Sequence, residues 1–591
     1  MCGFAGEHRS GERADVAVVE RMAACMSRRG PDGAGSWSAG AVALAHRRLK
    51  IIDLSEHGSQ PLVDPLVGRT VAFNGCIYNH RELRAELERL GHTFFSTSDT
   101  EVIAKAHAEW GDRCVERFMG MFAFAIEERD SGRLLLARDR LGIKPLYLAE
   151  AGGALRFGST LPGLLAGGGI DTSIDPVALH HYLSWHGVVP APHTMLRGVR
   201  KLPPATLLAI EPDGRRTEQR YWAAPHSRLP EHSGWDEHDW QDALLDALRT
   251  AVDRRMVADV PVGVLLSGGL DSSLIVALLA EAGQRGLETF SIGFESGGGR
   301  EGDEFRWSDL VAREYGTEHH RIPVSTSRMV PALDGAIAAM SEPMVSHDCV
   351  AFYLLAEEVS RSCKVVQSGQ GADEVLAGYS WYQAVAAGGQ DGTDAYRKAF
   401  FDRPHAEMAA MLEPEHLVGE DVSRAFMEEH FGRPGADEPV DRALRLDTEI
   451  MLVDDPVKRV DNMTMAWGLE ARVPFLDHEF VELAAACPPA LKLAHGGKGV
   501  LKDASRRVLP GPVIDRPKGY FPVPALSSLE GEALELVRDV MGGQCARGRG
   551  LLKPGYVDRL LAEPHAHETT LEGSKLWQVA LLEMWLQRNG L

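Results

Sequence analysis

The chain begins with MCGFAG, which places a cysteine thiol at position two. If Met1 is removed, Cys2 carries both a thiol and a free α-amino group. A thiolate is a strong nucleophile, and an adjacent amine can serve in place of a separate histidine base. The N-terminus therefore predicts covalent catalysis by Cys2, against the alternative of an inert thiol at a frayed chain end.

A second reactive pattern is SGGLDSS at residues 267–273, between the apolar run VGVLL and the helical pattern SLIVALLA. Glycines let a backbone approach a ligand closely, and successive N–H groups at a helix N-terminus bind anions. Asp271 can hold a divalent metal beside phosphates. The loop lacks the lysine of a Walker A motif. We therefore expect a nucleotide-phosphate site of another type rather than a simple capped turn.

A similar turn, SGQGADE at residues 368–374, follows the short apolar run CKVVQ. Its Asp373 and Glu374 offer a second pair of metal ligands. Two loops that leave neighbouring parallel strands face each other across a crevice at the carboxyl ends of those strands. Together the two motifs predict a nucleotide crevice, which the second motif alone would not.

The surrounding sequence predicts two domains that would hold these groups. Residues 1–220 alternate short apolar runs with turn signals, which is typical of antiparallel sheet with a few helices. Residues 221–240 are rich in Pro, His and acidic residues, and we expect a linker there. In residues 241–591 strands first alternate with helices, which indicates a parallel α/β sheet, and the C-terminal part is mostly helical.

Composition limits the partners and the compartment. The net charge is −21, from 63 basic and 84 acidic residues, which argues against a nucleic-acid partner. The eight cysteines contain no CxxC pair, and His319 and His320 suit a structural role better than a metal site. Neither an apolar run of roughly 18 residues nor a signal-peptide pattern is present. We expect a cytoplasmic protein with small-molecule substrates and no membrane partner; a homodimer is left open.

Two later stretches, KRVDNMTMAWGLEARVPFLD (458–477) and GKGVLKDASRRVLPGPVIDRPKGYFPVP (497–524), complete an ordered set of motifs. With SGGLDSS, they make the chain resemble the glutamine-dependent asparagine synthetases of the B type over its whole length. The resemblance implies a class II glutamine amidotransferase domain at 1–220, an N-terminal-nucleophile (Ntn) α/β/β/α antiparallel sandwich. It also implies an asparagine synthetase-like ATP pyrophosphatase domain at 241–591, with a parallel sheet and a helical C-terminal part.

In the first domain the resemblance assigns roles to residues in AHRRLKIID, FNGCIYN and STSDTEV, with RGPDG (29–33) as a signature turn beside the site. Cys2 is the nucleophile. Arg48 binds the glutamine carboxylate, a task that suits a guanidinium fork. Asn74 and Gly75 form the oxyanion hole, and Asp99 takes the substrate ammonium.

In the second domain the resemblance assigns an ATP site and a Mg²⁺ site. Lys498 matches the lysine that stabilises the adenylation transition state, where a cation faces charge developing on the α-phosphate. The alternative for Lys498 is a solvated surface lysine. Asp271 and Asp373 match the Mg²⁺ ligands. The residues matched to ATP binding are Leu266, Ser267, Gly268, Gly269, Asp271, Ser272, Ile292, Ser368 and Gly369.

The chain departs from the family pattern at two positions. Where the family usually has NGEIYN, this chain has Cys76 in place of the glutamate, and we expect glutaminase activity to survive because the oxyanion donors remain. Where the family has SGEG or SGDG, this chain has Gln370, which we place in the acceptor site. An amide can neither act as a base at neutral pH nor pair with an α-ammonium as a carboxylate does. Free aspartate is therefore disfavoured as the acceptor.

These variants, with YLSWHGVVPAPHT (182–194), resemble the N-acetylglutaminylglutamine amidotransferase branch, which amidates an acylated dipeptide to give an osmoprotectant. The implied ligase uses ATP and Mg²⁺ to adenylate a carboxylate, and then amidates it with ammonia from glutamine. The alternatives are asparagine synthesis from aspartate, ring closure as in β-lactam synthetases, and glutamine hydrolysis or regulation without synthesis. The intact Cys2, Arg48 and Asp99 argue against ring closure, and the intact SGGLDSS loop, Asp373 and Lys498 argue against the third alternative.

An uncleaved N-terminal extension tests the role of Cys2. Because the extension blocks the α-amino group that acts as the base, glutamine-dependent synthesis should stop. Ammonia-dependent synthesis should continue, since it does not use the first site. The measurement compares the two nitrogen donors in tagged and untagged protein, and glutamine use by the tagged protein at the untagged rate would contradict the prediction.

Overall fold

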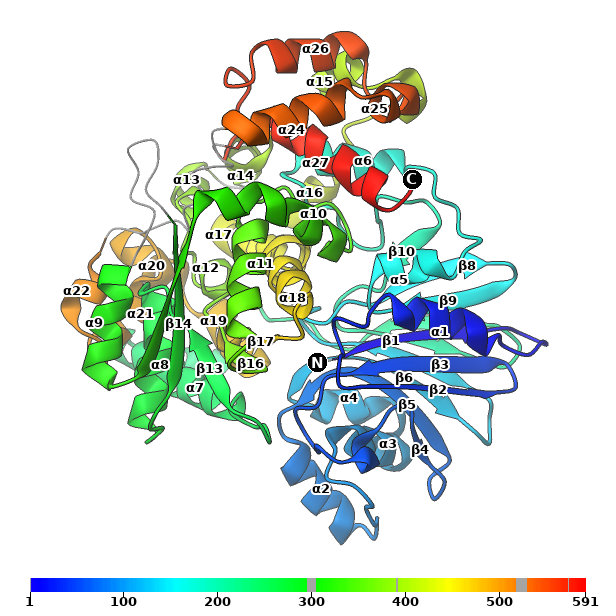
Figure 1. The fold of residues 1–591 in the computed structure, drawn as a ribbon. Helices are drawn as coiled ribbons and strands as arrows, with labels where there is room; N and C mark the ends of the chain where they lie inside the picture. Colours follow the sequence, from blue (N-terminus) through cyan, green and yellow to red (C-terminus); the bar gives the residue numbers. More distant parts are fainter. Residues whose placement is uncertain (1, 295–304, 390–391, 517–528, 572) are drawn as a thin grey trace.

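The computed structural model describes residues 2–294, 305–389, 392–516, 529–571 and 573–591. Its two domains lie side by side, the first coloured blue to cyan and the second green to red in Figure 1. The N-terminus lies on the side of the first domain that faces the second (Figure 1). Among the described helices, none has both the length and the apolar character needed to cross a membrane.

The first domain is built on two six-stranded antiparallel sheets. One sheet has the order β10-β8-β9-β1-β3-β2, with β1 (Gly3–His8), β2 (Gly33–Ala39), β3 (Val42–Arg48), β8 (Tyr147–Ala151), β9 (Ala154–Gly158) and β10 (Val199–Lys201). The other has the order β12-β11-β7-β6-β5-β4, with β4 (Leu62–Asp64), β5 (Arg69–Ile77), β6 (Gly120–Glu128), β7 (Leu134–Arg138), β11 (Thr206–Ile210) and β12 (Arg216–Arg220). Helices α1 (Val16–Ala24) and α5 (Leu161–Ala166) contact the first sheet, and α3 (Asp99–Trp110), beside α2 (His80–Arg89), contacts the second.

The residues of β5 show why the two sheets form a sandwich. Val71 and Phe73 belong to the apolar cluster under α3, whereas Ala72 belongs to the cluster between the sheets, with Phe4 of β1. The side chains of a strand alternate between its two faces, so both faces of β5 are buried. Asn74 shares the face of Ala72 and therefore points toward the sheet in which the chain begins.

The second domain contains a five-stranded parallel sheet in the order β15-β14-β13-β16-β17. Its strands are β13 (Val262–Leu265), β14 (Glu288–Phe294), β15 (Glu318–Val324), β16 (Val365–Gln367) and β17 (Glu470–Arg472). Val264 and Val365 pack in the cluster formed with α7 (Glu237–Arg254) and α8 (Leu270–Glu281), and Leu265 and Val366 pack in the cluster formed with α11 (Asp348–Val359). Helices thus cover both faces, as parallel sheets require.

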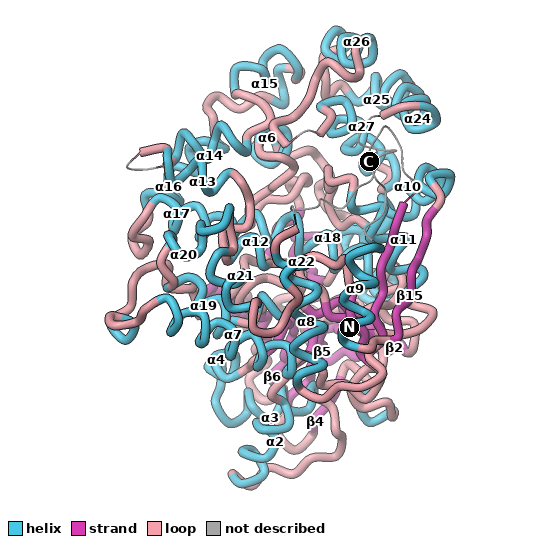
Figure 2. Tube along the Cα trace, turned by 90° about the vertical axis from the view of Figure 1, so that its left-hand side faces the viewer, coloured by secondary structure: helices cyan, strands magenta, loops and turns pink. Residues whose placement is uncertain are grey.

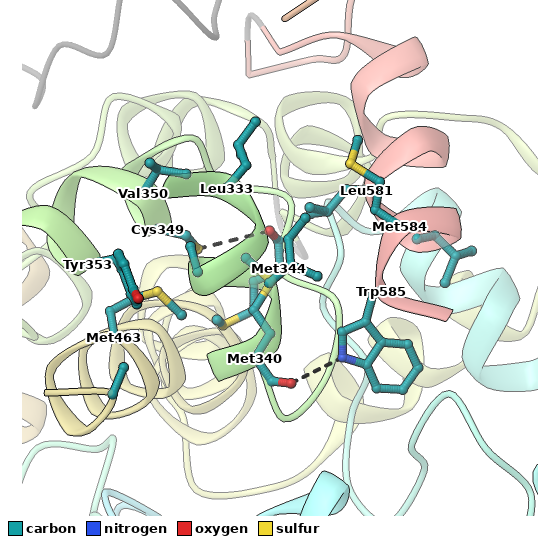
Figure 3. Packing of buried hydrophobic residues seen from close by; sticks show 14 of the residues in the cluster. Leu333, Met340, Met344, Cys349, Val350, Tyr353, Met463, Leu581, Met584 and Trp585 are labelled. Atoms are coloured by element: carbon teal, nitrogen blue, oxygen red, sulfur yellow. Dashed lines mark hydrogen bonds between the residues drawn. The ribbon is translucent and has the colours of Figure 1, made fainter. Parts of the chain in front are cut away.

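The C-terminal helix α27 (Lys575–Arg588) packs against α10 (Met329–Ala339) and the segment that follows it. Figure 3 shows this core, where Trp585 Nε1 donates to the Met340 carbonyl at 3.1 Å. Figures 1 and 2 place α26 (Pro554–Ala562) and α2 at opposite ends of the molecule. The other α-helices within the described residues are α4 (Cys114–Arg117), α6 (Pro176–Ser184), α9 (Phe305–Tyr315), α12 (Ala372–Val375), α13 (Trp381–Ala387), α14 (Thr393–Phe400), α15 (His405–Met411), α16 (Val422–Gly432), α17 (Pro439–Leu446), α18 (Lys458–Met465), α19 (His478–Ala486), α20 (Pro489–Leu493), α21 (Gly499–Ser505), α22 (Gly511–Ile514), α24 (Gly531–Gly542) and α25 (Gln544–Arg549).

Buried ion pairs join the two domains. Asp461 on α18 lies 2.9 Å from Arg29 Nη1 and 3.2 Å from Lys144 Nζ. Lys201 on β10 lies 2.9 Å from Asp454. All of these side chains are nearly inaccessible to solvent. Removing one partner of a buried pair leaves an uncompensated charge, so these contacts fix how the domains sit on each other.

The architecture confirms the expected fold class in both domains: antiparallel sandwich first, then parallel sheet with a helical C-terminal part. One boundary differs from the sequence prediction. Helix α7 begins at Glu237, inside the segment 221–240 expected to be a linker, because Asp236 and Asp239 form a capping box. Residues 517–524 of the last motif lie outside the described residues.

Candidate active sites

The first pocket lies at the N-terminus, where β1 begins. Its lining includes Cys2, Arg48, Gly75 and Asp99, from four separate segments of the first domain. Asn74 joins them, because the backbone N–H of Cys2 donates to Asn74 Oδ1 at 3.1 Å. The structure therefore brings together all five residues that the resemblance linked to glutamine.

The Cys2 thiol is almost fully buried, with 7% of the residue exposed. Burial raises the pKa of the thiol, and the Leu49 backbone N–H and the Arg48 charge only partly oppose this effect. The thiol is therefore protonated at neutral pH. A base must take this proton before attack, a task that an α-amino group freed by removal of Met1 can perform.

Asn74 and Gly75 have the properties of oxyanion donors. Asn74 Nδ2 is buried and has no hydrogen-bond partner among the described residues. Buried donors are nearly always paired, so this exception points to a ligand. At Gly75 a Cβ atom would lie 2.1 Å from the Met121 carbonyl oxygen, so only glycine fits beside β6. An amide donor and a close backbone approach beside the thiol suit a developing oxyanion.

Arg48 and Asp99 place opposite charges in the pocket. Arg48 Nη1 donates to the Ser55 carbonyl at 2.7 Å, and Nη2 donates to the carbonyl of Asp53, so the guanidinium is held by the loop that follows β3. Asp99 is the first residue of α3, and its Oδ2 accepts the Ile77 N–H at 3.1 Å. Burial raises the pKa of Asp99. A cation and a carboxyl group in one pocket match the two charged groups of a free amino acid.

Two residues of the second domain, Glu470 and Arg472 on β17, also line this pocket. Arg472 Nε donates to Glu470 Oε1 at 2.5 Å, and Arg472 Nη2 lies 3.7 Å from Cys76 Sγ. Burial acts to raise the pKa of Glu470, but the surrounding positive charges, including Arg472, lower it to about 2. Both residues lie in the motif GLEARVPFLD, but they were not predicted to belong to this site, because no spacing in the sequence connects them to position two.

The second pocket is a crevice of about 350 Å³ at the carboxyl ends of β13 and β16. These strands are adjacent and parallel, so the loops that follow them face each other. A Cβ on Gly369 would lie only 2.9 Å from Asp271 Cβ, which shows how closely the loops approach. The lining contains the residues matched to ATP apart from Gly268, namely Leu266, Ser267, Gly269, Asp271, Ser272, Ile292, Ser368 and Gly369.

Gly268 shapes the loop instead of lining the crevice. Its φ is +73°, and a Cβ there would lie 2.5 Å from the Ser308 backbone nitrogen. The Ser267 N–H donates to Ser272 Oγ at 3.2 Å, which ties the start of the loop to the first turn of α8. The N-terminus of α8 therefore opens on the crevice, with the N–H groups and helix dipole that attract phosphate.

Lys498 connects the two loops. Its Nζ lies 2.7 Å from Asp271 Oδ2 and 2.8 Å from Asp373 Oδ1. Only 7% of the residue is exposed, so it is not the solvated surface lysine of the alternative prediction. Burial acts to lower the pKa of Lys498, but the two carboxylates raise it, so the side chain is charged. It caps α21 with a φ of 55°, a left-handed conformation that is uncommon outside glycine.

The residues assigned to Mg²⁺ fit such an ion. Asp271 and Asp373 offer carboxylate oxygens from the two facing loops, and Mg²⁺ prefers oxygen ligands of this kind. Both carboxylates lie within 2.8 Å of one ammonium group, so they can share a cation. Bound beside phosphates, Mg²⁺ would offset their negative charge.

The crevice is also lined by Gln370, Tyr379, Asp348 and Arg459, and the last three were not predicted from the sequence. Arg459 Nη1 lies 3.9 Å from Asp348 Oδ2, and burial raises the pKa of Asp348 to about 6. Tyr379 Oη donates to Glu374 Oε1 at 2.6 Å. Burial, and then the charge of Asp373, raise the pKa of Glu374 to about 7. The Glu374 carboxyl group therefore contacts Tyr379 and lies in the field of Asp373, and its pairing with Asp373 as a metal ligand stays a prediction.

The fold and the two pockets define a protein that combines an Ntn-type glutamine amidotransferase domain with a nucleotide-binding α/β domain. The family model described as glutamine amidotransferase domain matches residues 1–222, and the model described as asparagine synthase matches residues 243–587. The chain belongs to the asparagine synthase family. It is a carbon–nitrogen ligase, a glutamine-hydrolysing amidotransferase of the asparagine synthetase type, and its family uses ATP.

Three relatives show the extent of the similarity. Glutamine-hydrolysing asparagine synthetase 1 of Bacillus subtilis is 31% identical over 100% of this chain and 97% of its own. A putative glutamine-hydrolysing asparagine synthetase of Mycobacterium tuberculosis is 32% identical over 97% and 94% of the two chains. Asparagine synthetase B of Escherichia coli is 27% identical over 84% and 77%.

The protonation of Asp99 should make the KM for glutamine depend on pH. Because burial raises its pKa, the carboxylate takes up a proton as the pH falls through that raised value and then no longer attracts an α-ammonium. We expect KM for glutamine to rise on acidification. Asp99→Asn should raise KM about 10- to 100-fold, the loss of one charged hydrogen bond, and remove its pH dependence.

Steady-state glutaminase assays from acidic to neutral pH check this prediction. Asp130→Asn, which alters an exposed carboxylate of the same domain, serves as the control and should leave KM unchanged. A persisting rise of KM on acidification in Asp99→Asn would assign the titration to another group.

Proposed function

We propose that the enzyme amidates an acylated dipeptide, N-acetylglutaminylglutamine, with ammonia taken from glutamine. The observation that carries the proposal is Gln370, an amide in the crevice at the position where the family has a carboxylate. An amide offers neutral hydrogen bonds and no charge for an α-ammonium, and a substrate with an acylated amine needs none. The blocked dipeptide amide is uncharged, which suits an osmoprotectant made in the cytoplasm.

At the first site, Cys2 attacks the side-chain amide of glutamine. The freed α-amino group of Cys2 takes the thiol proton and returns it to the departing ammonia. Asn74 and Gly75 stabilise the oxyanion, while Arg48 and Asp99 hold the carboxylate and ammonium of the substrate. Water then hydrolyses the thioester and releases glutamate.

At the second site, the acceptor carboxylate attacks the α-phosphate of ATP, which forms an acyl-adenylate and releases pyrophosphate. The 267–273 loop and the N-terminus of α8 bind the phosphates, and Lys498 offsets the charge that develops on them. Asp271 and Asp373 would hold Mg²⁺ there. Ammonia that arrives from the first site displaces AMP and forms the new amide. Because both reactants are held in one crevice, the attack is effectively intramolecular.

Asparagine synthesis from aspartate is a second candidate, favoured by Asp348. This carboxyl group lies in the same crevice as Gln370 and can pair with an α-ammonium. Two features weaken it as a partner, since burial raises its pKa to about 6 and Arg459 already lies 3.9 Å away. We therefore retain the dipeptide as the proposed acceptor.

Product analysis separates the two acceptors. Purified enzyme is given ATP, Mg²⁺ and glutamine with either N-acetylglutaminylglutamine or aspartate, and AMP release and product mass are measured. We expect amide formation with the dipeptide. Turnover with aspartate and none with the dipeptide would refute the proposal.

The variant Gln370→Glu is the matched probe of specificity. It should lower kcat/KM for the dipeptide about 10- to 100-fold, because the new carboxylate is left unpaired beside an acylated nitrogen that carries no charge. Glutamine hydrolysis, which uses the first pocket, should not change. An unaltered acceptor preference would show that position 370 does not select the substrate.

A further inference from the structure

Three polar side chains converge outside both pockets. They belong to α6, α15 and the N-cap of α16, and these helices lie in the upper half of Figure 1. His180 lies on α6, His405 is the first residue of α15, and Asp421 is the N-cap of α16. His180 Nε2 lies 3.0 Å from His405 Nδ1 and 3.8 Å from Asp421 Oδ1. Among the residues that the structure describes, this is the one group of three His, Cys, Asp or Glu ligands whose atoms lie within 4.8 Å of one another.

Neighbouring groups fix this cluster in place. His180 is 1% exposed, and its Nδ1 lies 2.8 Å from Oγ of the buried Ser423. The same Oγ lies 3.0 Å from His181 Nδ1, so the hydroxyl can donate to His181 and accept the N–H of His180. In that arrangement the lone pair of His180 Nε2 faces His405 and Asp421. Metal-binding histidines commonly donate their second N–H to such a partner.

A proton shared between the two imidazoles explains only part of this geometry. One N–H···N hydrogen bond satisfies His180 and His405, but it gives no reason for a carboxylate 3.8 Å from the same nitrogen. Ligand atoms about 2.0 Å from a tetrahedral zinc ion lie about 3.3 Å apart, and the observed distances bracket that value. Asp421 is held by its own cap, since Oδ1 accepts the Arg424 N–H at 3.1 Å.

We propose that His180, His405 and Asp421 bind one divalent transition-metal ion of the zinc class. Two imidazoles and one carboxylate are ligands that suit Zn²⁺ or Co²⁺, whereas Mg²⁺ prefers oxygen ligands alone. His405 and Asp421 are partly exposed, so solvent can supply a further ligand. None of the three residues lines the thiol pocket or the nucleotide crevice, and the ion therefore has no part in the chemistry there.

The ion would fasten parts of the chain that are distant in sequence. Helix α6 lies within the residues matched by the amidotransferase model, and α15 and α16 lie within those matched by the asparagine synthase model. A ligand that binds only the folded state stabilises that state. The site is therefore structural, and its occupancy raises the thermal unfolding midpoint.

Cobalt substitution of the full-length protein tests the proposal. Metal-free protein is titrated with Co²⁺ in the absence of ATP, and visible absorption and binding stoichiometry are recorded. A four- or five-coordinate site with two imidazoles absorbs far more strongly than an octahedral oxygen site, so Co²⁺ bound at Asp271 and Asp373 does not imitate the signal. We expect one strongly absorbing ion per chain, displaced by Zn²⁺, and a higher unfolding midpoint in its presence.

Two variants assign the signal, and one controls for it. Asp421→Asn keeps the helix cap but removes the charged ligand, and His405→Gln removes one imidazole at a partly exposed position. Changing a residue that only supports a metal ligand weakens metal binding about 10- to 100-fold. Each of these two variants removes a ligand itself and should therefore weaken Co²⁺ binding by more than that. His416→Gln, in the same segment, should bind as the unaltered protein does. The proposal fails if no intense band forms, or if the band survives in both variants, which would leave a hydrogen-bonded histidine pair only.

Discussion

One buried carboxylate, Asp461, joins the two domains at the segment that carries Cys2. It lies between Arg29 and Lys144 of the first domain, and Arg29 Nε also donates to the Cys2 carbonyl at 3.3 Å. Burial acts to raise the pKa of Asp461, but the two cations lower it, so the carboxylate is charged. Breaking such a pair costs about 3–5 kcal/mol because the remaining charge stays buried. This contact ties the segment that carries the nucleophile to α18.

That constraint explains why the first pocket is built from both domains. Helix α18 is followed by β17, so fixing Asp461 also fixes Glu470 and Arg472 against the pocket that contains Cys2. The same strand pairs with β16, whose carboxyl end carries the second nucleotide loop. The short strand β17 therefore lines the thiol pocket and also belongs to the parallel sheet whose loops form the nucleotide crevice. The thiol pocket is thus lined by both domains, whereas the residues that line the nucleotide crevice all belong to the second domain.

Local patterns predicted much of the fold and of the site. The 267–273 loop was identifiable because strand, glycine turn and helix follow one another within a few residues, and the two loops do meet where the strand order predicts. The resemblance supplied residues such as Arg48 and Asp99, which line one pocket with Cys2 although they are distant in sequence. Glu470 was not predicted, because only tertiary packing brings β17 to the N-terminus. The start of α7 was not predicted, because the polar and acidic residues around Asp236 are typical of a linker as well as of a helix cap.

We propose that nitrogen released from glutamine in the thiol pocket reaches the nucleotide crevice without mixing with ammonia in bulk solvent. A ¹⁵N label that starts in the side-chain amide of glutamine tests this path. The enzyme is given ATP, its acceptor, glutamine labelled with ¹⁵N in the side-chain amide, and an excess of unlabelled ammonium, and the product amide is analysed by mass spectrometry. We expect a product that carries ¹⁵N despite the excess of unlabelled ammonium, and dilution of that label in Asp461→Asn, where the contact between the domains is weakened. A product that carries the bulk nitrogen ratio in the unaltered enzyme would contradict the proposal.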